Sequence, residues 1–121
     1  MGDVADRIAE RVAQNQATFR DANERIEAAA KGMTHLERVP FICECPHQDC
    51  TELTHLTLDE YEAVRAGERR FLVVPGHEVC EAEGVTVATI VDRKARFSVL
   101  EKVGVSGEVA AELDPRQRAE P

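Results

Sequence analysis

The chain has 121 residues and a formal net charge of −8, which suits one small domain and disfavours general binding to nucleic acids or anionic membranes. No window approaches the roughly 20 consecutive apolar residues of a membrane-spanning helix. Only 4% of the residues are aromatic and tryptophan is absent. A core of aliphatic side chains in so short a chain is thin, so a bound metal ion would add needed stability.

Residues 3–32 predict one long helix, because the segment contains no proline and its only glycine, Gly32, stands at its end. Apolar and small residues recur along it at alternating spacings of four and three, which is the period of packed helices. This seam comprises Ile8, Val12, Asn15, Phe19, Ala22, Ile26, Ala29 and Met33. We therefore assign residues 1–33 to an N-terminal helix that packs on its own domain or binds a protein partner, including a second copy of the chain.

Residues 34–113 predict a small, mostly antiparallel β-sheet domain with one short helix, so the overall class is α+β. Strands are expected over 39–45, 51–56 and 71–74. Thr57 and Glu60 have the spacing of a capping box before a helix over 58–66, which Gly67 ends.

The C-terminal part of this domain predicts a β-hairpin, because the runs 85–91 and 97–103 alternate on either side of a polar turn over 92–95. An acidic loop over 78–84 precedes it. A bend over 104–107 and a helical turn or strand over 108–113 follow it, and the polar residues 114–121 predict a flexible tail.

Three cysteines stand close together as C-x-C-x4-C, at Cys43, Cys45 and Cys50, and the turn pair Pro75-Gly76 precedes His77. Zinc prefers thiolate and imidazole ligands in a tetrahedron, and Zn–S bonds of ~2.3 Å place the sulfurs roughly 3.7 Å apart. Residues i and i+2 of a regular strand lie roughly 6.5 Å apart, so the chain must bend near Pro46. The pattern predicts a structural Zn²⁺ site whose ligands are Cys43, Cys45, Cys50 and His77.

Cys80 is the main alternative to His77 as fourth ligand, ahead of His47 and His55. Other chemistry is open to the same residues. A disulfide from Cys50 to Cys43 or Cys45 can form in an oxidising compartment, and Cys43 or Cys50 with His77 can act as nucleophile and base. The N-terminus shows no basic-then-apolar leader, so we expect a cytoplasmic protein with reduced thiols.

A closed site with four protein ligands leaves no open position for substrate or water, which favours a protein-interaction or regulatory module over an enzyme. Three alternatives stay open. A zinc-dependent hydrolase would need an open metal position and a general base such as Glu44, Asp49 or Glu78. A thiol redox sensor would release zinc on oxidation. A nucleic-acid-binding zinc module, against which the net charge argues, would need a basic face formed by Arg65, Arg69, Arg70, Arg93 and Arg96.

Several segments resemble a group of small uncharacterised proteins of high-GC bacteria: 39–45 (Val-Pro-Phe-Ile-Cys-Glu-Cys), Cys50-Thr51, 56–65, 70–77 with its Pro-Gly-His end, 23–27 and 99–102. The likeness covers roughly residues 19–115, and the Cys-x-Cys and Pro-Gly-His elements are its most specific parts; segment 78–91 departs from it. In that group the three cysteines and the histidine recur together, whereas a cysteine at the place of Cys80 does not. The resemblance thus implies His77 as the fourth ligand, and it implies no activity.

Overall fold

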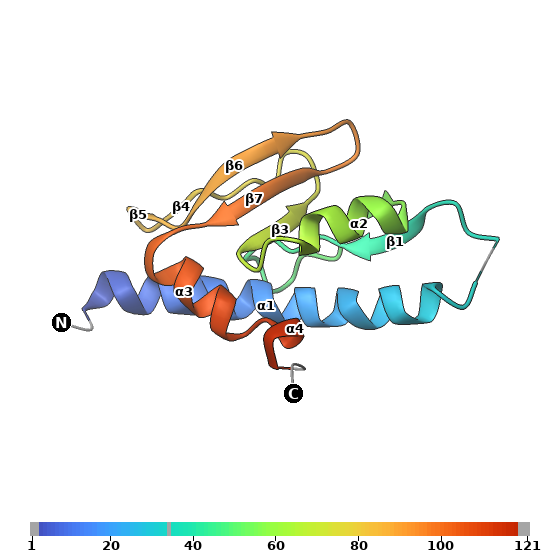
Figure 1. The fold of residues 1–121 in the computed structure, drawn as a ribbon. Coiled ribbons are helices and arrows are strands. Elements are labelled where there is room, and N and C mark those ends of the chain that lie inside the picture. Colours follow the sequence, from blue (N-terminus) through green and yellow to red (C-terminus); the bar gives the residue numbers. More distant parts are fainter. Residues whose placement is uncertain (1–2, 34, 119–121) are drawn as a thin grey trace.

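The computed structural model describes residues 3–33 and 35–118, and it confirms the predicted α+β class. In Figure 1, the long helix α1 runs along one side of the molecule, and the strands and α2 lie on the other side. The elements in chain order are α1 (Val4–Ala30), β1 (Val39–Ile42), β2 (Leu53–Leu56), α2 (Leu58–Arg65), β3 (Arg70–Val73), β4 (Glu81–Ala82), β5 (Val85–Thr86), β6 (Ala88–Arg93), β7 (Ser98–Lys102), α3 (Gly104–Glu112) and α4 (Pro115–Arg118). None of the described helices is both long enough and apolar enough to cross a membrane. Residues 1–2, 34 and 119–121 of the predicted segments lie outside the described residues.

All strand pairs in the described chain are antiparallel: β3-β7-β6 form a three-stranded sheet, and β1-β2 and β4-β5 form two-stranded ribbons. The predicted hairpin is present as β6–β7, but its first strand begins at Ala88. Val85 and Thr86 pair instead with β4, within the segment expected to be a loop. The break falls at Val87, which is fully buried and donates its N–H to the Cys80 carbonyl at 2.8 Å.

Helix α2 begins at the predicted capping box. The Thr57 hydroxyl accepts the Glu60 N–H at 3.0 Å, and the Glu60 carboxylate accepts the Thr57 N–H at 2.8 Å. One turn later, Tyr61 is fully buried and stacks on Phe41 of β1, with ring centroids 4.3 Å apart. The cap and this aromatic contact fix α2 against the β1–β2 ribbon.

The inward face of α1 differs from the predicted seam by one residue position. Its described inner residues include Ala9, Ala13, Gln16, Arg20, Asn23, Glu27 and Ala30, each one place after a seam residue. Of the seam, Ile8 and Val12 are buried, Phe19 and Ile26 are half-buried, and Met33 is 47% exposed. The rotation arises because four polar side chains turn inward, where they find hydrogen-bonding or ionic partners.

The C-terminal part of the chain packs against α1. Residues 104–107, expected to be a bend, form the first turn of α3, whose Gly107 fits so closely that a Cβ there would lie 2.8 Å from the Lys102 carbonyl oxygen. In the predicted tail, Asp114 is buried and Arg116 forms ion pairs with α1 and α2. These contacts anchor the described part of the tail.

Candidate metal centre

The structure brings Cys43, Cys45, Cys50 and His77 together, with their ligand atoms all within 4.8 Å of one another. The Sγ atoms of Cys43 and Cys50 each lie 3.6 Å from Nδ1 of His77. Tetrahedral zinc with Zn–S of ~2.3 Å and Zn–N of ~2.0–2.1 Å would place sulfur and nitrogen about 3.5 Å apart. The cluster can therefore hold a metal ion such as zinc, and the part of the chain that the structure describes contains one such group.

The Cys-x-Cys segment bends because its backbone changes partner within one residue. Cys43 donates its N–H to the Glu52 carbonyl at 3.0 Å, which extends the β1–β2 ribbon, whereas Glu44 donates to the Leu72 carbonyl of β3 at 2.9 Å. Further on, Cys50 donates its N–H to the His47 carbonyl at 3.1 Å, so a tight turn returns the chain to the first two cysteines. The bend required by the sequence argument is thus made by pairing with two different strands.

His77 is presented by a turn that needs glycine. Pro75 and Gly76 occupy its centre, Gly76 has φ of +95°, and the His77 N–H donates to the Val74 carbonyl at 2.9 Å. Pro-Gly at these positions is the signature of a type II turn. At its base, the Val74 N–H donates to Sγ of Cys43 at 3.3 Å, so the histidine loop and the cysteine loop are directly linked.

Polar residues of α1 hold the Cys-x-Cys backbone in place. The Asn23 side chain donates to the Ile42 carbonyl and accepts the Ile42 N–H, both at 2.8 Å, and it also donates to the Glu44 carboxylate at 2.8 Å. The same carboxylate accepts the Leu72 N–H at 2.9 Å, and Gln16 donates to the Glu44 carbonyl at 2.8 Å. Sequence reasoning missed these supporting residues; the helical spacing of the polar residues at 16, 20, 23 and 27 was the available signal.

Burial dominates the electrostatics of the site. It raises the pKa of the Cys43 and Cys45 thiols. It also raises the pKa of Glu44 to about 7, even though hydrogen bonds from Asn23 and Leu72 favour the carboxylate. Cys43 and Cys45 are fully buried, while Cys50 and His77 are partly exposed. A bound divalent cation would supply the positive charge that stabilises thiolates here.

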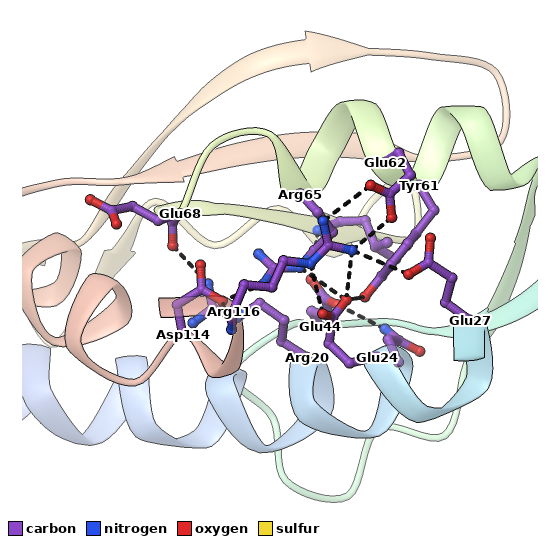
Figure 2. Close-up of polar contacts among 12 residues, drawn as sticks. Arg20, Glu24, Glu27, Glu44, Tyr61, Glu62, Arg65, Glu68, Asp114 and Arg116 are labelled. Atoms are coloured by element: carbon purple, nitrogen blue, oxygen red, sulfur yellow. Dashed lines mark hydrogen bonds and ion pairs between the residues drawn. The ribbon is translucent and has the colours of Figure 1, made fainter. Parts of the chain in front are cut away.

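Beyond the cysteine loop, a partly buried ionic cluster joins α1, α2 and the C-terminal segment (Figure 2). Arg65 bonds Asp114 and, at 3.2 Å, Glu24. Arg116 bridges Glu24 at 2.7 Å, Glu62 at 2.7 Å and Glu27 at 3.2 Å. Because Arg65 is buried here and Arg70 pairs with Glu101 at 3.1 Å, these two arginines of the predicted basic face are already engaged.

Arg20 is fully buried beside this cluster. Its guanidinium donates to the backbone carbonyls of Glu68 at 2.8 Å and Ala110 at 2.7 Å, and it lies 4.4 Å from the centroid of the Phe71 ring. One side chain of α1 thus ties the helix to the loop before β3 and to α3.

The remaining candidates lie outside the metal-ligand group. Cys80 does not join it, and neither do His47 and His55, which are exposed. The carboxylates considered as general bases are also outside: Glu44 faces Asn23 and Leu72, Glu78 accepts hydrogen bonds from Gly76 and Ser98, and Asp49 is exposed. Cys43, Cys45, Cys50 and Cys80 are all free thiols.

Comparison of the chain with protein-family models, with curated proteins and with solved structures finds no match. The likeness to the small proteins of high-GC bacteria stays a prediction. Function is therefore argued from the geometry of the site.

Proposed function

We propose that this chain binds Zn²⁺ through Cys43, Cys45, Cys50 and His77, and that it acts as a protein-interaction or regulatory module whose zinc is structural. The observation that carries the proposal is the convergence of three sulfurs and one imidazole nitrogen within 4.8 Å. Four such ligands complete the tetrahedron of a structural site, whereas catalytic zinc keeps one position for water.

The position of the ligands supports a structural role. They come from the end of β1, the following loop and the turn after β3, and Cys43 and Cys45 belong to a core cluster with Ile8, Val73 and Leu100. An ion at this point would join α1, the β1–β2 ribbon and the three-stranded sheet. In a chain with so few aromatic residues, metal binding contributes directly to the free energy of folding.

The absence of a carboxylate from this group, among the described residues, supports the structural role over a hydrolytic one. A hydrolytic zinc site uses a nearby general base on the metal-bound water. Glu44 and Glu78 lie outside the group and accept hydrogen bonds from other residues.

Metal analysis with matched variants tests the proposal. The full chain, purified under reducing conditions, should contain equimolar zinc, and its Co²⁺ form should show the intense sulfur-to-metal charge-transfer bands of thiolate ligation. Cys43→Ser and His77→Gln should lose the metal. Cys80→Ser and His55→Gln change the same residue types outside the cluster and should retain it. Equal zinc content in all four variants would overturn the ligand assignment.

We further propose a reducing, cytoplasmic setting and a partner surface on the outer flank of α1, where the partner is a second copy of the chain or another protein. Phe19 and Ile26 are half-buried on this flank, and Ala29 and Met33 are exposed. Ala29→Glu should weaken self-association in sedimentation experiments or the retention of a captured partner. Ala28→Glu adds the same charge at an exposed neighbour outside the seam and should not. If neither readout depends on Ala29, the flank is not the interface.

A further inference from the structure

A surface depression of about 490 Å³ lies at the junction of the β1–β2 ribbon and the β6–β7 turn, and none of the four candidate metal ligands lines it. It is lined by Arg38, Leu53, Thr54, His55 and Arg96. Two arginines and one histidine thus line a single concavity. Two other surface depressions do contain carboxylates in their lining: Asp59 and Asp92 line one of them, and Asp21 and Glu24 line the other.

The lining of this depression is cationic in a protein whose net charge is −8. No carboxylate is among its lining residues. The ion pair of Arg38 with Glu37 is long at 3.7 Å, and the Glu37 side chain is 85% exposed. An exposed pair of this kind contributes little, so the guanidinium of Arg38 stays available to a ligand. A concavity lined by one sign of charge also concentrates ions of the opposite sign.

The backbone around the depression is held by regular structure. His55 lies opposite Pro40 in the β1–β2 ladder. The buried Thr54 hydroxyl donates to the Arg96 carbonyl at 2.5 Å, which fastens the β6–β7 turn to β2. Lys94 donates its N–H to the Phe97 carbonyl at 2.8 Å and closes the turn. Leu53, Thr54 and His55 thus project from a paired strand, while Arg38 directly precedes β1 and Arg96 lies in the fastened β6–β7 turn.

We propose that this depression binds the dianionic phosphate group of a small phosphate monoester. Guanidinium groups match the tetrahedral oxyanion with paired N–H donors, and Arg38 and Arg96 line the depression from two separate segments, the one before β1 and the β6–β7 turn. The Leu53 side chain, 53% exposed at the same site, provides an apolar surface for the carbon side of the ester. The site needs neither the metal nor the partner surface of α1, so it is a binding function in addition to the proposed one.

A titration of the zinc-loaded full chain, followed by backbone amide NMR at constant ionic strength, tests this site. The probes are inorganic phosphate and n-butyl phosphate. Saturable shifts are expected at the amides of Leu53, Thr54, His55 and Arg96. The double variant Arg38→Gln/Arg96→Gln should weaken binding at least about ten-fold, because it removes both charged donors. Arg7→Gln/Arg25→Gln removes the same charge from exposed positions of α1 and should leave binding within about two-fold.

The two probes separate the sources of the phosphate group. Tighter binding of n-butyl phosphate that is lost in Leu53→Gln supports an ester ligand. Equal affinity for both probes would overturn the proposal of an ester ligand and would leave free phosphate as the ligand. Shifts that rise linearly without saturation, or equal losses in the two double variants, would overturn the site itself. Thermal melts of every variant confirm that the exposed substitutions leave the fold intact.

Discussion

Asn23→Ala should weaken both the fold and metal binding, although Asn23 is not a metal ligand. Its side chain makes three hydrogen bonds at 2.8 Å to the segment that carries Cys43 and Cys45: two to the Ile42 peptide and one to the Glu44 carboxylate. The substitution leaves these partners without the amide that satisfied them.

The magnitude follows from the number and kind of these bonds. Hydrogen bonds to neutral groups contribute about 1 kcal/mol each, and one to a charged group about 1.5–3 kcal/mol, so the loss is about 3–5 kcal/mol. If the metal-free chain is unfolded and the metal binds only the folded chain, the same free energy weakens the apparent zinc affinity by about two to four orders of magnitude. Urea unfolding of the zinc-loaded protein and competition with a chelator measure the two effects.

Asn15→Ala is the matched control, because Asn15 also reaches from α1 to the metal loop. Its contacts are a long 3.5 Å hydrogen bond to the Pro46 carbonyl and an exposed one to Gln48 at 3.0 Å, which together should contribute less than about 1 kcal/mol. Equal urea midpoints and equal zinc affinities for the two variants would refute the argument that Asn23 supports the Cys-x-Cys segment.

Two further predictions concern buried cations of the interior. Arg20→Met should destabilise the protein by about 2–4 kcal/mol, because it removes the donor to the backbone carbonyls of Glu68 and Ala110. Arg25→Met, at an exposed position of the same helix, should change the urea midpoint little. A similar urea midpoint for the two variants would contradict the role of Arg20 in tying α1 to the loop before β3 and to α3. Burial lowers the pKa of Lys102 from 10.5 to about 8, so between these pH values the unfolded chain binds more protons and stability rises with pH. This rise in the free energy of unfolding should be about 3 kcal/mol, and it should be absent in Lys102→Met. The measurement is the difference between the unfolding free energies of the original chain and of Lys102→Met, followed from pH 7 to pH 10.5. Parallel pH profiles of the two proteins would show that Lys102 is not buried as a cation.

Local signals with a stereochemical cause could be predicted from sequence. The Thr57–Glu60 capping box and the Pro75-Gly76 turn both depend on contacts within four residues, and both are present. The proximity of the three cysteines to His77 was also predictable, because few arrangements other than a shared metal explain C-x-C-x4-C beside a presented histidine. The way in which the Cys-x-Cys segment bends could not be predicted, because it depends on the pairing of Glu44 with Leu72 of β3, 28 residues further along the chain.

The face of α1 could not be predicted from apolar periodicity. That rule assigns polar residues to solvent, yet Gln16, Arg20 and Asn23 are fully buried. Their partners are backbone groups, the Lys102 ammonium and the Glu44 carboxylate, all from distant segments, which a periodicity argument does not contain. The start of the hairpin was misplaced for a related reason. The alternation through Val85 and Val87 is continuous in sequence, but the Cys80 carbonyl accepts the Val87 and Ala88 N–H groups, and the run is divided between the β4–β5 ribbon and the three-stranded sheet.

The polar face of α1 and the metal loop depend on each other. Buried polar groups cost free energy unless each finds its partner, so Asn23 and Gln16 are tolerated inside only while the Cys-x-Cys backbone is held where they can reach it. Conversely, Glu44 is fully buried between two cysteines, and its carboxylate is satisfied by Asn23 and Leu72, from α1 and β3. A metal ion that fixes the cysteines would therefore also support the contacts of Asn23 and Gln16, and losing the ion would weaken this part of the docking of α1. Arg20, Glu24 and Glu27 hold the same helix to the loop before β3 and to the C-terminal segment, so loss of the ion should loosen α1 first beside the cysteine loop.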